Sequence, residues 1–180
     1  MLCAARLRGP MDRIASFTVN HLLLEPGVYV SRVDRDSATG AVVTTFDLRL
    51  TAPNREPVMN TAECHTIEHL GATFLRNHPT WAPRVVYFGP MGCRTGFYLV
   101  IFGEVSSREI LPLARELFAF VRDFEGGEAD IPGARPDECG NYLDQNLGMA
   151  RWLARRYLER DLGDDVRLEY PAPLGDEAGR

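Results

Sequence analysis

Residues 60–77, NTAECHTIEHLGATFLRN, decide how this chain folds around its chemistry. Asn60 followed three residues later by Glu63 is a capping box, which predicts that a helix begins here. Three apolar residues then recur at helical spacing and predict the buried face of that helix: Ile67, Leu70 and Phe74. Pro79 cannot continue a helix, so the pattern predicts about four turns that end near His78.

His65 and His69 lie four residues apart in this helix, with Glu68 directly before the second histidine. Residues four apart share one face of an α-helix, so both imidazoles can reach one ion. The His-x-x-Glu-His order is an inverted metal-binding motif in which the glutamate is free to move protons. We therefore predict that His65 and His69 bind a divalent metal and that Glu68 is a general acid and base.

A catalytic metal needs about three protein ligands and an open position, so a third ligand must come from elsewhere in the chain. Cys139 is the preferred candidate. We expect Cys139 and Gly140 to open a third helix, and a helix N-terminus lowers the pKa of a thiol. Glu138 and Cys93 remain as alternatives for this position.

Cys93 is the second candidate for proton transfer. It lies between Gly92 and Arg94 in a loop that offers few side chains to shield it. A neighbouring arginine and a nearby metal favour the thiolate, which can act as a base near neutral pH. Cys64 precedes the first histidine by one position and faces about 100° away from it, so we expect a structural role there.

The composition restricts the classes of function. The chain has 180 residues, a net charge of -5 and 20 basic residues that are all arginine. The charge argues against binding of nucleic acid or anionic lipid. No apolar run approaches the roughly 18 residues of a membrane span, and no signal peptide is evident, so we expect a cytoplasmic protein. Without lysine, Schiff-base catalysis is excluded, and a metal or hydrogen-bond donors must activate any carbonyl.

Four β-rich runs and two further helices complete the expected fold. The strands are expected at residues 27–33, 41–50, 84–88 and 96–102. One helix is expected at residues 106–124, with a kink or a delayed start caused by Pro112. The last helix is expected to bury one face: Leu143, Leu147, Ala150, Ala154 and Tyr157. This order predicts an α+β fold in which an antiparallel sheet of about four strands is packed by helices in a single domain.

The expected organisation has three parts. Residues 1–10 form a flexible N-terminal extension, residues 11–162 form the catalytic metalloenzyme domain, and the acidic residues 163–180 form a flexible tail.

Five separated motifs, in order along the chain, carry a resemblance to a known family. They are Ser16-Phe17-Thr18-Val19-Asn20-His21, Phe46-Asp47-Leu48-Arg49, His65-Thr66-Ile67-Glu68-His69-Leu70, Pro90-Met91-Gly92-Cys93-Arg94-Thr95-Gly96 and Glu138-Cys139-Gly140. Over roughly residues 11–160 the chain resembles S-ribosylhomocysteine lyase, the LuxS family of autoinducer-2 synthesis in quorum sensing. The cysteine loop and the histidine motif are highly specific when they occur together.

The resemblance implies an activity and a set of residue roles. The reaction would cleave S-ribosylhomocysteine to homocysteine and 4,5-dihydroxy-2,3-pentanedione by carbonyl migration and β-elimination of the thiol. One divalent metal per chain would be iron(II), with zinc or cobalt as substitutes, and the protein would be a homodimer with active sites at the interface. The metal ligands would be His65, His69 and Cys139. Glu68 and Cys93 would move protons. The substrate-binding residues would be Ser16, His21, Arg49 and Arg76.

Departures and competing interpretations remain. Tyr87 and Gly89 stand where the family often has an acidic residue and a serine. A zinc peptidase of the inverted-motif type would use Glu138 as its third ligand, although the chain is short for enclosing a peptide. A metal-stabilised module without catalytic activity is the other alternative, and loss of folding on chelation would favour it.

Overall fold

The computed structural model describes residues 13–173, and its described strands form one antiparallel sheet in the order β1-β2-β4-β3. The strands are β1 (Gly27–Arg35), β2 (Val42–Arg49), β3 (Val85–Pro90) and β4 (Gly96–Phe102). All three pairings between neighbouring strands are antiparallel. The α+β class and the four expected strands are therefore confirmed.

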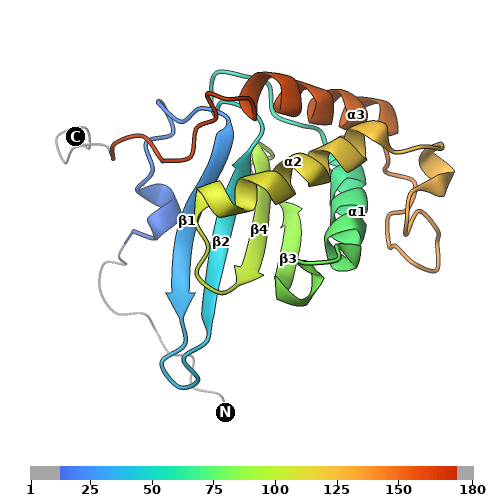
Figure 1. Cartoon of the computed structure of the whole chain (residues 1–180). Helices are drawn as coiled ribbons and strands as arrows, with labels where there is room; N and C mark the ends of the chain where they lie inside the picture. Colours follow the sequence, from blue (N-terminus) through green and yellow to red (C-terminus); the bar gives the residue numbers. More distant parts are fainter. Residues whose placement is uncertain (1–12, 174–180) are drawn as a thin grey trace, which may run out of the picture.

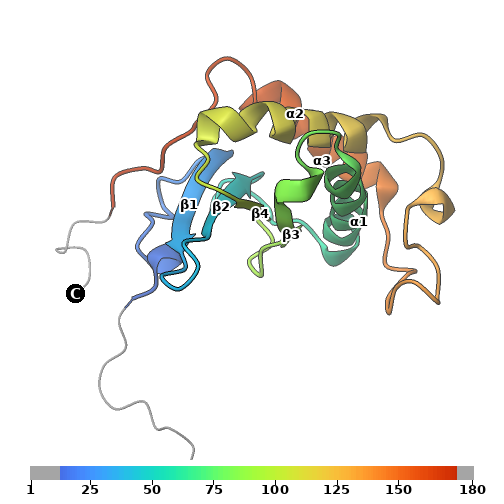
Figure 2. The same cartoon turned by 60° about the horizontal axis from the view of Figure 1, so that its bottom comes forward.

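The α-helices of residues 13–173 lie on the same side of this sheet, as Figures 1 and 2 show. They are α1 (Thr61–Asn77), α2 (Ser107–Asp123) and α3 (Leu147–Arg156). The described residues also form short helical segments: η1 (Ala15–Phe17) before β1, η2 (Ala82–Arg84) before β3, η3 (Glu128–Asp130) before α3 and η4 (Tyr157–Asp161) after α3. Within residues 13–173 the opposite face of the sheet carries no α-helix.

The core lies between the sheet and the helices. Side chains alternate along β2, and its apolar face is turned toward the helices. Phe46 and Leu48 are fully buried toward the helices, where Ile67 and Leu70 of α1 meet them in one cluster. Burial of each such side chain contributes roughly 1.5–3 kcal/mol. The other face of β2 carries polar side chains and is therefore available for a site: Thr45, Asp47 and Arg49.

Both expected capping boxes are present. Glu63 accepts a hydrogen bond from the backbone N–H of Asn60 at 2.5 Å, so α1 begins where the sequence predicts. In α2, Ser106 and Glu109 accept each other's backbone N–H groups. Pro112 does not delay the start of α2, which begins at Ser107.

The third helix begins later than expected. α3 starts at Leu147, where the side chain of Asn146 accepts the backbone N–H of Met149 at 3.0 Å. Leu143 lies in the preceding loop and is 79% exposed, so its expected burial is wrong. Helical periodicity applies only within the helix, so it could not predict the burial of Leu143 in the loop before it.

The C-terminal segment contacts β1 through Arg167 and Tyr170. β1 is an edge strand, and the N–H of Val28, on its side away from β2, donates to the carbonyl of Arg167 at 2.9 Å. The ring of Tyr170 stacks on Tyr29 with centroids 4.7 Å apart. The expected extension at residues 1–10 and residues 174–180 lie outside the described residues.

Among the described helices, none has the length and apolar character that crossing a membrane requires.

Candidate metal centre and active site

Three side chains from distant parts of the chain converge at one point. α1 presents His65 and His69 on the same face, with ring centroids 4.4 Å apart. Cys139 Sγ lies 3.4 Å from Nε2 of His65. The candidate ligand atoms of all three residues lie within 4.8 Å of one another, which is close enough to hold one metal ion. Glu138, the alternative ligand, is not a member of this group.

The hydrogen bonds of the two histidines suit metal binding. Nδ1 of His65 lies 2.9 Å from the carbonyl of Asp144, and Nδ1 of His69 lies 2.6 Å from the carbonyl of Pro132. Each Nδ1–H therefore donates to a backbone carbonyl, which leaves both Nε2 lone pairs for a metal. Two imidazoles and a thiolate suit zinc, iron(II) or cobalt better than magnesium or calcium.

Gly133 allows the Pro132 carbonyl to approach His69. Its φ is +77°, and a Cβ at this position would lie 2.8 Å from Nδ1 of His69. Any larger residue would be strained in this conformation and would also push the imidazole. The loop between η3 and α3 therefore orients the histidine as well as supplying the third ligand, a role that the sequence motifs did not reveal.

Cys139 does not lie at a helix start, which corrects the reason given for its choice. Its sulfur accepts the backbone N–H of Asn141 at 3.4 Å, within a series of turns that ends at Asn146. The residue is half-buried and reaches the histidines from the loop that projects beside α1 in Figure 1. Its sulfur is therefore contacted by a local backbone N–H and not by the N-terminus of a helix.

Glu68 borders an open cavity beside the metal group. The cavity has a volume of about 370 Å³ and is also lined by His65, Met91, Gly92 and Arg94. Glu68 is half-buried and is not part of the three-ligand group. A carboxylate that faces a cavity next to a metal, without binding the metal, is placed to exchange protons with a bound molecule.

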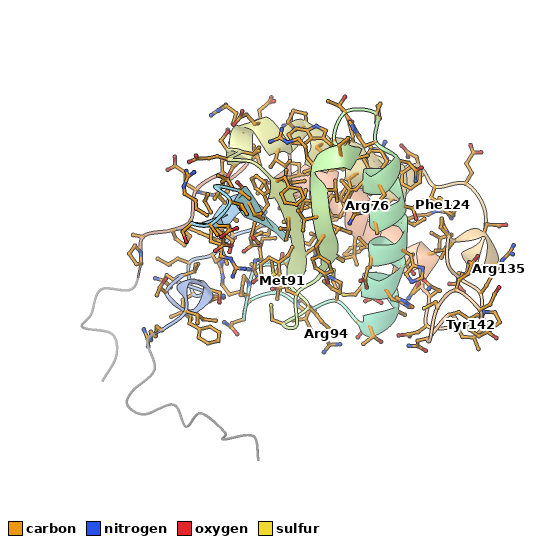
Figure 3. The ribbon with its side chains drawn as sticks, turned by 90° about the horizontal axis from the view of Figure 1, so that it is seen from below. Arg76, Met91, Arg94, Phe124, Arg135 and Tyr142 are labelled. Carbon is orange, nitrogen blue, oxygen red and sulfur yellow. The ribbon has the colours of Figure 1, made fainter. Side chains whose placement is uncertain are left out.

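Cys93 borders a second cavity of about 250 Å³. Three of the four expected substrate-binding residues line the same cavity: Ser16, His21 and Arg49. Met91 and Gly92 line both the cavity of Glu68 and the cavity of Cys93, so the two cavities adjoin. Met91 and Arg94 are labelled in Figure 3. No described residue of the metal group lines the cavity of Cys93.

The surroundings of Cys93 favour its thiolate. Its sulfur lies 3.0 Å from the hydroxyl of Thr95 and 3.9 Å from a guanidinium nitrogen of Arg49. Partial burial alone would raise the pKa of this thiol, but the hydrogen bonds of Thr95 and the charge of Arg49 outweigh burial and lower the pKa. Burial instead raises the pKa of Cys64 to about 11, which agrees with the structural role expected for it.

Asp47 fixes Arg49 beside the reactive thiol. The Asp47 carboxylate accepts a hydrogen bond from Arg49 at 2.5 Å, and both side chains are at most 5% exposed. A second guanidinium nitrogen donates to Thr95. Asp47 was not singled out from the sequence as a site residue, although alternation along the strand already places it on the same face as Arg49.

Arg76 is the one expected substrate-binding residue that the structure does not bring to either cavity. It lies near the C-terminal end of α1, about 16 Å along the helix axis from His65 at 1.5 Å per residue. Its guanidinium donates to the carbonyls of Val85 and Val86 at 2.7 and 2.8 Å. Figure 3 shows Arg76 at the end of α1 opposite Arg94.

Tyr87 and Gly89, the two departures from the family pattern, form a single feature. The phenol of Tyr87 occupies the space in which a Cβ of residue 89 would lie. Both residues are on β3, two positions apart, so their side chains would share one face. Glycine at position 89 leaves room for the tyrosine ring in this orientation, and the ring lines a hollow on the uncovered face of the sheet.

An open three-ligand metal group with a free carboxylate nearby is typical of a metal-dependent enzyme and not of a structural metal site. A sequence model of the S-ribosylhomocysteinase (LuxS) family matches residues 14–167. The chain therefore belongs to the LuxS family.

Curated relatives agree with that assignment. The chain is 59% identical over 163 residues to the S-ribosylhomocysteine lyase of Clostridium acetobutylicum. The aligned region covers 89% of this chain and 99% of the relative. Identity to the protein of the same name from Clostridium beijerinckii is 61% with the same coverage. The S-ribosylhomocysteine lyase of Porphyromonas gingivalis is 50% identical, again over 89% of this chain and 99% of the relative.

Proposed function

We propose that this chain cleaves S-ribosylhomocysteine to homocysteine and 4,5-dihydroxy-2,3-pentanedione. The convergence of His65, His69 and Cys139 beside Glu68, with an activated Cys93 on the adjoining cavity, is the observation that carries the proposal. The relatives named S-ribosylhomocysteine lyase support the same substrate. The location proposed for this activity is the cytoplasm.

The metal ligands proposed are His65, His69 and Cys139, with one divalent ion per chain and iron(II) as the native metal. When bound, such an ion would polarise carbonyl and hydroxyl oxygens of the substrate. The hydrogen bonds from each Nδ1 to a backbone carbonyl would hold both imidazoles in the orientation that metal binding requires.

Cys93 and Glu68 would divide the proton transfers. Migration of the substrate carbonyl from C1 to C3 requires, at each stage, removal of a proton beside the carbonyl and return of a proton to the next carbon. The lowered pKa of Cys93 suits this reversible exchange. Glu68 would then remove the C4 proton, the C5–S bond would break, and the electron pair would leave on the sulfur of homocysteine. Ser16, His21 and Arg49 would hold the substrate.

The proposed assembly is a homodimer that shares its active sites. The uncovered face of the sheet has a hollow of about 350 Å³ whose lining is partly apolar: Ile14, Tyr87, Tyr98 and Val100. Exposed apolar surface of this kind marks an association surface, and a second copy of the chain is the partner proposed. Because the Cys93 cavity has none of the metal group in its lining, we propose that each site combines Cys93 of one subunit with Glu68 and the metal of the other.

The test is release of free thiol from S-ribosylhomocysteine by the metal-loaded protein, followed with a thiol reagent. We expect Glu68→Gln and Cys93→Ala to bind about one metal per chain but to lose turnover by ~10²-fold or more. His65→Ala and Cys139→Ala should lose the metal as well as the activity. Normal turnover by Cys93→Ala would show that its catalytic role is wrong.

A further comparison separates the proposal from its alternatives. Glu138→Gln should retain both metal and thiol release, because Glu138 is exposed and stands outside the ligand group. Peptide cleavage that disappears with this variant would instead support the zinc peptidase. Folding that depends on metal, without any thiol release, would support a module that has no catalytic activity.

A further inference from the structure

The C-terminal segment extends into the cavity that contains Cys93. The carbonyl of Arg167 is bonded to the edge of β1, and three residues later the ring of Tyr170 stacks on Tyr29 at an interplanar angle of 15°. Tyr170 lines the same cavity as Cys93. The family match ends at residue 167, so Tyr170 stands just beyond it and its role does not follow from that match.

The phenol of Tyr170 is a hydrogen-bond donor to a buried carboxylate. It donates to Oδ2 of Asp47 at 2.9 Å, and the same oxygen accepts from Arg49 at 2.5 Å. Burial and the negative charge of Asp47 raise the pKa of Tyr170, so the phenol keeps its proton and remains a donor. Asp47 is 1% exposed, so protein donors must balance its charge.

Arg49 connects this carboxylate to the reactive thiol. One guanidinium nitrogen is bonded to Asp47, and the other donates to Thr95 and lies 3.9 Å from Cys93 Sγ. The position of the guanidinium therefore depends on two competing attractions, one toward the carboxylate and one toward the thiol. A donor that shares the carboxylate oxygen changes the balance between them.

We propose that Tyr170 is a positioning residue for Cys93 that acts through Asp47 and Arg49; this inference rests on the proposed function, in which Cys93 transfers protons. By donating to Asp47, the phenol reduces the attraction of the carboxylate for the guanidinium. Without the phenol, Asp47 draws Arg49 toward itself, and the thiol loses part of the positive charge that favours its thiolate.

The test uses the full-length, metal-loaded protein with Tyr170→Phe, which keeps the stacked ring and removes the hydroxyl. Alkylation of Cys93 by iodoacetamide is measured from pH 5 to 10 by mass spectrometry of its peptide. We expect the alkylation midpoint to rise by about half a pH unit, since the thiolate loses charge stabilisation. We also expect kcat to fall by roughly three- to tenfold with little change in KM.

Other titratable or charged groups that line the cavity also contribute to the pH dependence of Cys93 alkylation: His21, Asp47, Arg49, Tyr98 and Tyr170. Tyr29→Phe is the matched control. It removes a hydroxyl from the other ring of the stacked pair, and that hydroxyl donates to the carbonyl of Glu25 and not to Asp47. We expect this control to lower the unfolding temperature without moving the alkylation midpoint.

Two results would overturn the inference. One is a Tyr170→Phe midpoint equal to or below that of the unaltered protein. The other is an equal rise in both tyrosine variants, which would reveal a general effect of packing. Alkylation does not require turnover, so the midpoint decides this inference even if the unaltered protein releases no thiol, an outcome that would refute the proposed function alone.

Discussion

At the scale of single residues, the candidate metal site depends on groups that hold the ligands as much as on the ligands themselves. The imidazole of His69 keeps its orientation because the Pro132 carbonyl accepts from Nδ1 at 2.6 Å. That carbonyl is close enough only because Gly133 adopts a φ of +77° and has no side chain. Partners of this kind orient the ligating nitrogen and raise its basicity.

We therefore predict that Gly133→Ala weakens metal binding by about tenfold or more, because the new Cβ displaces the imidazole and the backbone is strained. Zinc affinity measured by competition with a chromogenic chelator is the readout. Gly40→Ala is the matched control, since Gly40 has a φ of +72° but no atom within 4 Å of the added Cβ. It should cost about 1–2 kcal/mol of backbone strain and leave metal affinity unchanged. Equal affinities for the two variants would contradict the role of Gly133.

At the scale of elements, α1 and the loop before α3 must keep a constant separation for the third ligand to meet the first two. Thr66 connects them. Its hydroxyl lies 3.0 Å from the Ala62 carbonyl and 2.8 Å from Oε1 of Gln145, and it accepts the backbone N–H of Asn146 at 2.9 Å. Thr66 is fully buried, so these loop groups depend on it for their hydrogen bonds.

Thr66→Val keeps the shape of the side chain and removes the hydroxyl. We predict a loss of about 1–3 kcal/mol in the free energy of unfolding and a lower metal affinity, since the loop that carries Cys139 is no longer tied to α1. Denaturant unfolding of the metal-free protein and chelator competition measure the two effects. Thr73→Val on the same helix, which removes a half-exposed hydroxyl, should change stability by no more than about 0.5 kcal/mol. Retained affinity in Thr66→Val would mean that the loop is held by other contacts.

At the scale of the whole molecule, the chain presents two adjoining cavities that divide the residues proposed for catalysis. Glu68 and His65 line one of them, and Cys93 and Arg49 line the other. The sheet face next to η1 has no covering helix in the described residues, as Figure 2 shows. A symmetric pair of chains would cover this face and could bring complementary cavities together.

A mixed dimer of Glu68→Gln and Cys93→Ala chains tests that arrangement. If each site takes Glu68 from one subunit and Cys93 from the other, one of the two sites in the mixed dimer is intact. Thiol release should then recover to about half that of the unaltered dimer, although each variant alone is inactive. Differently tagged chains can be refolded together and purified by both tags. No recovery in the mixed dimer would place both residues of a site on the same subunit.

Much of this protein could be predicted from local patterns. Alternation in Val42–Arg49 and the capping boxes at Asn60 and Ser106 depend on neighbours in sequence, so the strands and the starts of α1 and α2 were predicted correctly. The four-residue spacing of His65 and His69 likewise requires only helical geometry. The late start of α3 was not predicted, and the contacts of the segment near Tyr170 have no local sequence signal, because both depend on partners far away in sequence.

The residue types alone establish which functional groups are available: two imidazoles and a carboxylate on one predicted helix, thiols elsewhere, and no lysine. The folded arrangement was needed to show that Cys139 joins the histidines from a loop, that Asp47 and Tyr170 stand behind Arg49, and that Arg76 does not line the cavities. The reason is physical. Helical and strand periodicity specify directions within one element, whereas distances between elements follow from how the core packs and from which buried polar groups must find partners.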